Sequence, residues 1–163
     1  MEVVQTARMV LSRVTLDDLT AVHELHSDPR TNVYNPGGPS VDLVSSRAML
    51  DLWLADWAER GIGYWAARAI GGSEVLGIGG LRRAIVGGDE VLNLYYRFRP
   101  SAWGHGYAGE LVEAALRVGK ELGTVVAVIR PDNLASLKVA ERAGMRRDRT
   151  IPYGGVESVV YVA

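Results

Sequence analysis

The stretch Trp103-Gly104-His105-Gly106-Tyr107-Ala108 decides the fold. Its two glycines lack side chains, so the backbone around them can curl about an anion. The amides of residues 105–108 precede or open a predicted helix, where unpaired N–H groups and the helix dipole favour a diphosphate. Taken alone, the stretch fits a tight strand-to-helix turn without a ligand equally well.

A dinucleotide-binding fold is the first alternative, because Gly104, Gly106 and Gly109 spell G-x-G-x-x-G. That fold places the first glycine directly after its first strand and alternates strands with helices. Here residues 99–103 intervene, and the strand-like run 90–98 before them ends a meander. The order of the elements therefore disfavours a dinucleotide fold.

The sequence predicts that residues 1–163 form a single mixed α/β domain. Seven runs are typical of strands: 8–14, 63–70, 74–85, 90–98, 125–129, 145–150 and 157–162. Four segments are typical of helices: one capped by Thr15 and ending near Ser27, one from Ser40 to Arg60, one from the glycine turn to Gly123, and one over Asn133–Ala143. Glycine hairpins and one strand–helix–strand crossover predict a mixed sheet with a parallel pair and helices on both faces.

A second block of sequence lies 25 residues beyond the glycine stretch. It reads Pro-Asp-Asn-x-x-Ser-x-x-x-x-Glu-x-x-Gly-Met and runs from Pro131, 25 positions after Gly106, to Met145. The two blocks together resemble the GNAT acetyltransferase superfamily, and most of all its branch of ribosomal-protein N-terminal acetyltransferases. The resemblance implies a GNAT-like fold, mostly antiparallel with a splayed parallel strand pair. It also implies an N-acetyltransferase that takes its acetyl group from acetyl-CoA.

The same resemblance implies where the cofactor binds. The pantetheine arm is expected on the backbone of the segment from Tyr96 to Phe98. Asn133 is expected to hydrogen-bond this arm and also to cap the last helix. The pyrophosphate is expected on the amides of Gly104, His105, Gly106, Tyr107 and Ala108.

The expected reaction is direct attack of an amine on a thioester in a ternary complex. It needs a neutral amine, a polarised carbonyl and a proton for the thiolate, since thiols titrate near 8.5 and alkyl amines near 10. The resemblance places Ser136 beside the sulfur as the proton donor, while Ala140 stands where other branches carry a tyrosine. The resemblance also implies that a backbone N–H, from Tyr95 or Tyr96, stabilises the developing oxyanion. The base position, a glutamate in many relatives, is Asn93 here, which can hold a water but cannot take its proton.

Three questions stay open at the level of sequence. Glu90, Glu157 or a water chain are alternatives for the missing base. An acyl-CoA-binding sensor or interaction module with little turnover is the alternative function. The acceptor is a small-molecule amine or a protein N-terminus, and the loop around Tyr34 and the helix carrying Trp53 and Trp57 are expected near it.

Composition narrows the remaining classes of function. A net charge of −1 gives no reason to expect nucleic acid or an anionic membrane as partner. No apolar run approaches the roughly 20 residues that span a bilayer, and the start of the chain does not resemble a signal peptide. The absence of cysteine excludes a disulfide and a thiolate metal site. We therefore expect a cytoplasmic monomer or homodimer that uses acetyl-CoA and no metal.

Overall fold

The computed structural model describes residues 2–163, and Met1 lies outside the described residues. The strands are β1 (Val3–Gln5), β2 (Met9–Arg13), β3 (Tyr64–Ala69), β4 (Val75–Val86), β5 (Asp89–Phe98), β6 (Val125–Ile129), β7 (Arg146–Tyr153) and β8 (Val156–Val162). The helices are α1 (Leu19–Ser27), α2 (Leu43–Arg60), α3 (Tyr107–Gly119) and α4 (Leu134–Arg142), with short 3-10 turns at Leu16–Asp18, Pro29–Thr31 and Pro100–Ala102.

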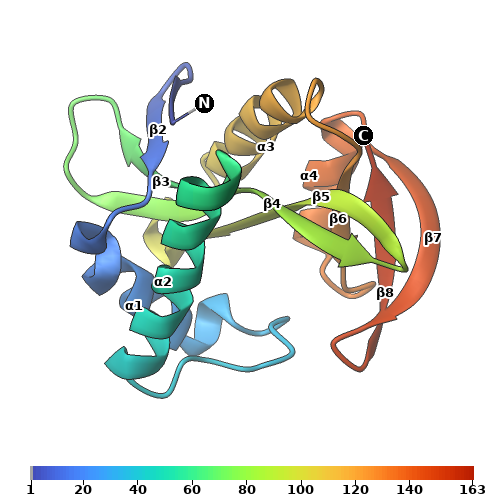
Figure 1. The fold of residues 1–163 in the computed structure, drawn as a ribbon, viewed down its shortest axis with the longest axis horizontal. Helices are drawn as coiled ribbons and strands as arrows, with labels where there is room; N and C mark the ends of the chain where they lie inside the picture. The colour runs from blue at the N-terminus through green and yellow to red at the C-terminus, as the bar shows by residue number, and fades with distance from the viewer. Residues whose placement is uncertain (1) are drawn as a thin grey trace.

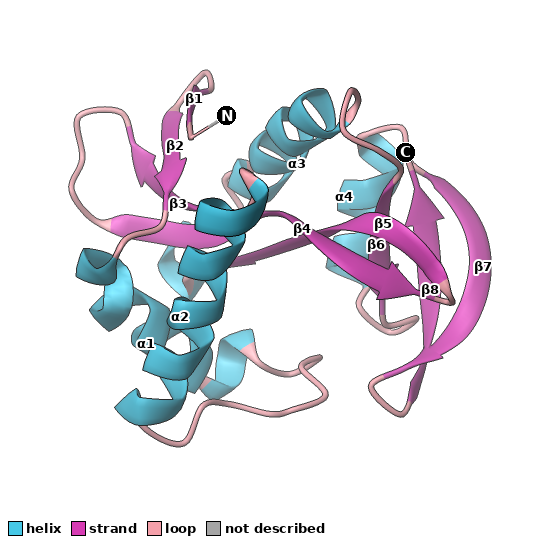
Figure 2. Cartoon of the chain, viewed as in Figure 1, coloured by secondary structure: helices cyan, strands magenta, loops and turns pink. Residues whose placement is uncertain are grey.

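All eight strands form one sheet in the order β1-β2-β3-β4-β5-β6-β8-β7 (Figure 1). Every neighbouring pair is antiparallel except β5 and β6, which run parallel. Helices α1 and α2 cover one face of the sheet, and α3 and α4 cover the other (Figure 2). The mixed sheet, its parallel pair and the helices on both faces confirm the fold predicted from the sequence.

The parallel pair is short, and its two strands separate along their length. Strand β5 is paired with β6 only at Leu92–Val125 and Asn93–Val126. On its other edge β6 pairs with β8 through residues 126–129. Residues 94–98 of β5 therefore have one free edge, and the sheet opens there into a cleft.

Aromatic side chains fix α2 on the sheet. Trp53 and Trp57 are buried, as the helical spacing of the apolar residues predicts. The indole Nε1 of Trp57 donates a 2.8 Å hydrogen bond to the backbone oxygen of Tyr64 on β3. Gly63 permits this approach, because a Cβ there would lie 2.7 Å from the Trp57 ring.

Three predicted boundaries differ from the structure. Strand β1 is not predicted, because three residues are too few for a period-two pattern; it pairs with β2. Helix α2 is capped by Asp42 rather than by Ser40, since the Asp42 carboxylate accepts from the Ser45 amide at 2.8 Å. Helix α3 ends at Gly119, not at Gly123, and a turn follows in which the Leu122 and Gly123 amides both donate to the Gly119 carbonyl. No helix within residues 2–163 is long and apolar enough to cross a membrane.

Candidate active site

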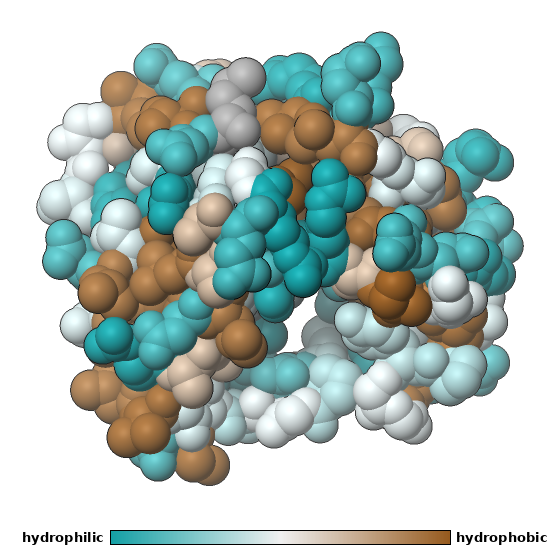
Figure 3. Space-filling view, viewed as in Figure 1, coloured by the Kyte–Doolittle hydropathy of each residue, from teal (hydrophilic) through white to brown (hydrophobic). Residues whose placement is uncertain are grey.

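A cleft of about 790 Å³ lies where β5 and β6 separate. Its walls come from five places: strand β5, strand β6, the starts of α3 and α4, and the loop over residues 30–35. Figure 3 shows that the surface is hollowed between the side of the molecule that carries α2 and the side that carries β7 and β8. The cleft is therefore open on the α1–α2 face, and its lining reaches the starts of α3 and α4 on the other face.

The glycine turn forms the cleft wall at the start of α3. Gly104 and Gly106 have φ angles of 78° and 80°, a left-handed conformation that side chains disfavour, and Gly106 is the N-cap of α3. A Cβ on Gly104 would have open space around it. The first-turn amides of α3, from Tyr107 and Ala108, have no partner within the helix. The turn and these amides form a cradle of free N–H groups at the cleft, and the binding of a diphosphate there stays a prediction.

The predicted cofactor residues are brought together at the cleft. Tyr96, Phe98, Gly104, Gly106, Tyr107, Ala108 and Asn133 all line it. His105 does not line it; its exposed ring lies against Tyr107, with ring centroids 5.8 Å apart. His105 is thus the one predicted residue of the glycine turn that the cleft lining does not include.

Two charged residues that sequence reasoning missed hold the glycine turn in place. The Glu110 carboxylate on α3 accepts from the backbone N of Arg8 at 2.7 Å and from its Nε at 2.9 Å. Burial tends to raise the pKa of Glu110, but hydrogen bonds from Thr6 and Arg8 outweigh it and lower the pKa. The Arg8 guanidinium lies over the Tyr107 ring, 4.6 Å from its centroid. The partners are 102 positions apart, so no local pattern predicts them.

Helix α4 presents Ser136 to the cleft in its first turn. The Asn133 side chain caps this helix, since its Oδ1 accepts from the Ser136 amide at 3.3 Å. The Tyr96 hydroxyl donates a 3.0 Å hydrogen bond to the Ser136 Oγ. Burial raises the pKa of Tyr96, although its bond to Ser136 opposes this, so the phenol is a protonated donor at neutral pH. Ala140, one turn later, is buried against the same cleft.

Asn93 occupies a different position from the other predicted residues. It lies on β5, where the strand is still paired with β6, and it does not line the cleft. Its Oδ1 is buried and accepts no hydrogen bond from the described protein groups. Glu90 and Glu157, the alternative bases, are exposed and also lie outside the cleft lining. The structure therefore brings no predicted carboxylate to the cleft.

An aromatic cluster borders the cleft on the α1–α2 face, and Tyr95 is its member in the cleft lining. Tyr95 stacks on Tyr64 with ring centroids 4.8 Å apart, and Trp53 packs on the edge of Tyr64 at 5.1 Å. The Tyr95 hydroxyl lies 2.6 Å from Nε2 of the buried His26. Burial raises the pKa of Tyr95 to about 12, although the nearby Arg97 opposes the shift. Tyr95 therefore keeps its proton at neutral pH.

His26 is the other partner in this cluster. Burial, and then the charge of Arg97, lower its pKa to about 4, although a bond to the Val22 carbonyl opposes the shift. The neutral ring donates from Nδ1 to the Val22 oxygen at 2.8 Å, so Nε2 accepts from Tyr95. His23 turns elsewhere, to the Ser46 hydroxyl at 2.8 Å. Within residues 2–163, no group of three His, Asp or Glu side chains is arranged to hold a metal.

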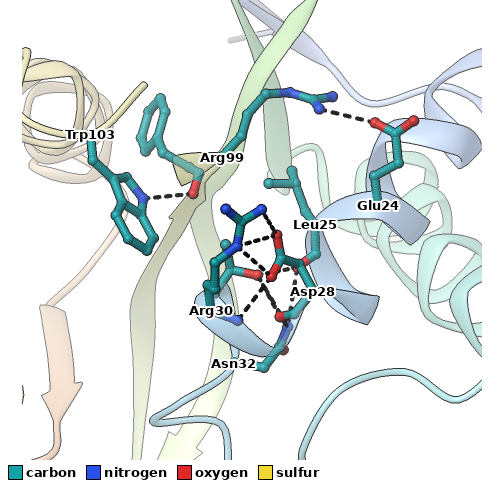
Figure 4. A network of polar contacts seen from close by, with 9 residues as sticks. Glu24, Leu25, Asp28, Arg30, Asn32, Arg99 and Trp103 are labelled. Carbon is teal, nitrogen blue, oxygen red and sulfur yellow. Dashed lines mark hydrogen bonds and ion pairs between the residues drawn. The ribbon is translucent and has the colours of Figure 1, made fainter. Parts of the chain in front are cut away.

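The loop after α1 is fixed by a network of polar contacts (Figure 4). Asp28 accepts from the backbone and the side chain of Arg30, at 2.9 Å and 2.7 Å. The buried Asn32 donates to the carbonyl of Leu25 at 3.1 Å. Further along, the Tyr34 hydroxyl reaches the backbone oxygen of Asp132 at 3.2 Å. The loop thereby connects α1 with the segment before α4 across the cleft. Its place near the acceptor stays a prediction.

Trp103 shields the turn that leads into the glycine stretch. Its indole Nε1 donates to the Phe98 carbonyl at 2.9 Å, as Figure 4 shows. The Phe98 ring in turn stacks with Tyr107, with centroids 6.3 Å apart and planes inclined by 19°. These contacts tie the end of β5 to the start of α3 and fix the position of the cradle.

Comparison with known proteins places this cleft in a family. The protein-family model "Acetyltransferase (GNAT) domain" matches residues 8–146. The chain therefore belongs to the GNAT acetyltransferase family. This agrees with the family predicted from the two sequence blocks; membership of the ribosomal-protein branch stays a prediction.

Similar proteins cover nearly the whole chain. The uncharacterized protein YkkB of Bacillus subtilis (strain 168) is 29% identical in an alignment of 158 positions that covers 88% of this chain and 88% of that protein. An acetyltransferase structure from Bordetella pertussis superimposes with a TM-score of 0.84 at 20% identity and covers 99% of both chains. The structure of AAC(6')-Ib in complex with ribostamycin and coenzyme A has a TM-score of 0.78 at 19% identity, over 94% of this chain and 92% of that one. At these identities the two structures support the fold alone.

Proposed function

We propose that the chain transfers an acetyl group from acetyl-CoA to a primary amine, by direct attack within a ternary complex. One observation carries the proposal: the cleft passes between β5 and β6 and has a different chemistry on each face. The α3–α4 face offers the diphosphate cradle and the Ser136 hydroxyl. The α1–α2 face offers an aromatic wall and a polar loop, which suit an acceptor. The acceptor class is a small amine or a protein N-terminus.

The cofactor assignment rests on the fit between the cleft residues and the parts of acetyl-CoA. The amides of Gly104 to Ala108 suit the pyrophosphate, and the free edge of residues 96–98 suits an amide-bearing arm. Asn133 lines the path between these two regions. When bound, acetyl-CoA supplies a thioester that is activated toward amines.

In this proposal the chain's own residues supply a hydrogen bond to the departing sulfur and the donor that polarises the carbonyl. Ser136 donates to the sulfur, and the Tyr96 hydroxyl, which donates to the Ser136 Oγ, orients the Ser136 hydroxyl. The proton that the amine releases neutralises the thiolate. A backbone N–H of Tyr95 or Tyr96 on the splayed edge stabilises the developing oxyanion. Donors that are fixed before the reaction need no reorganisation in the transition state.

The amine must lose a proton during the reaction, and no predicted carboxylate lies in the cleft to accept it. Asn93 has a buried, unbonded Oδ1, but it lies outside the cleft lining, where β5 is still paired with β6. Because an amide cannot accept the proton itself, we propose that the amine enters neutral or loses its proton through water. Activity should then rise with pH until the amine is deprotonated.

Little or no turnover is the second candidate. It is favoured by Asn93 at the base position and by the exposure of Glu90 and Glu157. An acyl-CoA-binding sensor or interaction module would keep the diphosphate cradle but would transfer acetyl groups slowly or not at all. Both candidates need the same cofactor, so binding alone does not separate them.

Two measurements test the proposal. Acetyl-CoA should raise the melting temperature and NADH should not, because a ligand of the native state stabilises it by mass action. Thiol release should then be followed with a panel of amines over pH 6 to 10. No thermal shift at millimolar acetyl-CoA contradicts the cofactor assignment. A shift without thiol release from any amine favours the non-catalytic candidate.

A further inference from the structure

Charged side chains in the cleft give information about the acceptor. Four of them line it: Arg30, Arg97, Arg130 and Asp132. Arg30 is paired with Asp28 at 2.7 Å, and Arg130 lies 3.9 Å from Asp132. Within residues 2–163, no carboxylate lies within 4.0 Å of the Arg97 guanidinium. Arg97 is thus the cation of the cleft lining whose charge is not balanced by an ion pair.

A neutral group holds Arg97 in place. Its Nη1 donates to the Asn32 Oδ1 at 2.7 Å, and its guanidinium lies 5.4 Å from the centroid of the Tyr95 ring. Asn32 is itself buried and fixed: its Nδ2 donates to the Asp28 carbonyl at 2.6 Å, and its Oδ1 also accepts from Asn35. The guanidinium is therefore oriented before any ligand arrives, and it has further N–H donors to offer.

Arg97 lies on the acceptor side of the sheet. Side chains alternate along a strand, so Arg97 and Tyr95 face α1 and α2, while Tyr96 and Phe98 face α3 and α4. The contacts agree: Tyr95 meets His26 and Trp53, and Tyr96 meets Ser136 on α4. The lowered pKa of His26, to which the Arg97 charge contributes after burial, shows that this charge acts on the α1 side.

We infer that the acceptor is a small amine that also carries a carboxylate, and that Arg97 binds this carboxylate. The inference rests on the proposed acetyl transfer and adds the class of its second substrate. A guanidinium matches a carboxylate with two parallel hydrogen bonds. Arg97 is two residues along β5 from Tyr95, about 7 Å, so the carboxylate lies several bonds away from the reacting nitrogen.

The charge of the cleft also disfavours polycationic acceptors. Ribostamycin, bound in the structure of AAC(6')-Ib, carries several amino groups. Such a ligand would bring its ammonium groups toward Arg97, and the one carboxylate that lines the cleft, Asp132, already lies beside Arg130. Repulsion between the Arg97 guanidinium and the ammonium groups opposes binding, so the charge of this cleft disfavours polyamines as acceptors.

The first experiment measures the preference for a carboxylate. Thiol release is followed with ω-amino acids of two to seven carbons, with their methyl esters, with a tripeptide amide and with ribostamycin. At least one acid should exceed its ester by about ten- to a hundredfold in kcat/KM, the range of a hydrogen-bonded charge pair. Arg97→Gln should abolish this ratio, and Arg97→Lys should retain part of it. Arg83→Gln is the matched control and should keep the ratio, because Arg83 is exposed and lies outside the cleft lining.

A binding experiment separates this inference from the proposed function. The same acids are titrated calorimetrically into wild type and Arg97→Gln, each saturated with CoA so that no reaction occurs. Binding to wild type, weakened at least about tenfold in the variant, supports the inference even if turnover is absent. Equal use of acids and esters, preference for ribostamycin or the peptide, or no binding of any acid would overturn it. Loss of CoA affinity in Arg97→Gln with an unchanged acid-to-ester ratio would assign Arg97 to the cofactor instead.

Discussion

The hydroxyl of Tyr96 on β5 donates a 3.0 Å hydrogen bond to the Oγ of Ser136 on α4. The two residues belong to elements on opposite sides of the opening between β5 and β6, and both line the cleft. Ala140 occupies the position at which other branches of the family are expected to carry a tyrosine. A phenol therefore reaches this region from the strand, where the helix supplies only a methyl group.

The first prediction concerns this pair. Ser136→Ala should lower kcat by about ten- to a thousandfold with little change in acetyl-CoA affinity, because the lost hydrogen bond acts mainly on the charge that develops on sulfur. Tyr96→Phe should lower kcat less, since Ser136 then keeps its own hydroxyl. The measurement is steady-state kinetics on an accepted amine, with acetyl-CoA binding measured separately.

Two controls define this prediction. The double variant should lose no more than Ser136→Ala alone if the hydroxyls act as one unit. Lys138→Ala, an exposed change on the same helix, should leave kcat unchanged. If Ser136→Ala turns over like wild type, Ser136 is only a helix residue and water is the proton source.

The second prediction concerns the glycine cradle. Gly106→Val should weaken acetyl-CoA binding strongly, because the φ of 80° at this position disfavours any side chain and the added Cβ would lie 3.4 Å from the Arg8 Nη2, so the turn that presents the amides is distorted. Gly88→Val is a matched control: its φ of 91° imposes a similar backbone strain, its Cβ has open space, and it lies outside the cleft. Calorimetric titration with acetyl-CoA distinguishes the two. Equal affinities in both folded variants would leave Gly106 as a structural turn residue.

The third prediction concerns the ion pair behind that cradle. Glu110→Gln should lower the free energy of unfolding by about 2 kcal/mol, since it weakens charge-assisted bonds from Thr6 and Arg8. Glu113→Gln, exposed one turn along α3, should change stability by less than about 0.5 kcal/mol. Urea unfolding at pH 7 measures both. Similar small losses in the two variants would show that Glu110 does not fix the turn.

Local sequence predicts the frame of the site, and for a physical reason. The left-handed glycines at 104 and 106 and the Asn133 cap depend on neighbouring residues, so a motif of a few positions specifies them. The hairpins of β3, β4 and β5 follow from short glycine loops in the same way. These are the parts of the site that the sequence predicts correctly.

The remaining site residues are determined by tertiary packing. Tyr96 meets Ser136 across 40 positions, and Arg97 meets Asn32 across 65. Neither pair has a local pattern, because only the separation of β5 from β6 and the path of the loop bring the partners together. Asn93 shows the converse: its position relative to the motif suggests a cleft residue, but β5 is still paired at that point.

The last prediction concerns stability at acid pH, and it rests on His26. The pKa of His26 falls from 6.5 to about 4 in the folded state, so above pH 6.5 the ring is neutral in both states. Between pH 6.5 and 4 the unfolded chain binds a proton that the folded chain does not, and stability falls as pH falls. The loss from this group should approach 3 kcal/mol, roughly 1.4 kcal/mol for each unit between the two pKa values.

The comparison of variants isolates this histidine from other groups. The carboxyls of Asp28, Asp42 and Glu110 have lowered pKa values and also cost stability as they become protonated. The measure is therefore the difference between wild type and His26→Gln in urea unfolding from pH 7.5 to 4. Wild type should lose stability more steeply between pH 6.5 and 4, whereas His23→Gln should follow wild type, since His23 bonds to Ser46 and not to the Tyr95 cluster. Parallel curves for wild type and His26→Gln would mean that His26 takes up its proton in the folded state, against the Tyr95 hydroxyl and the Arg97 charge.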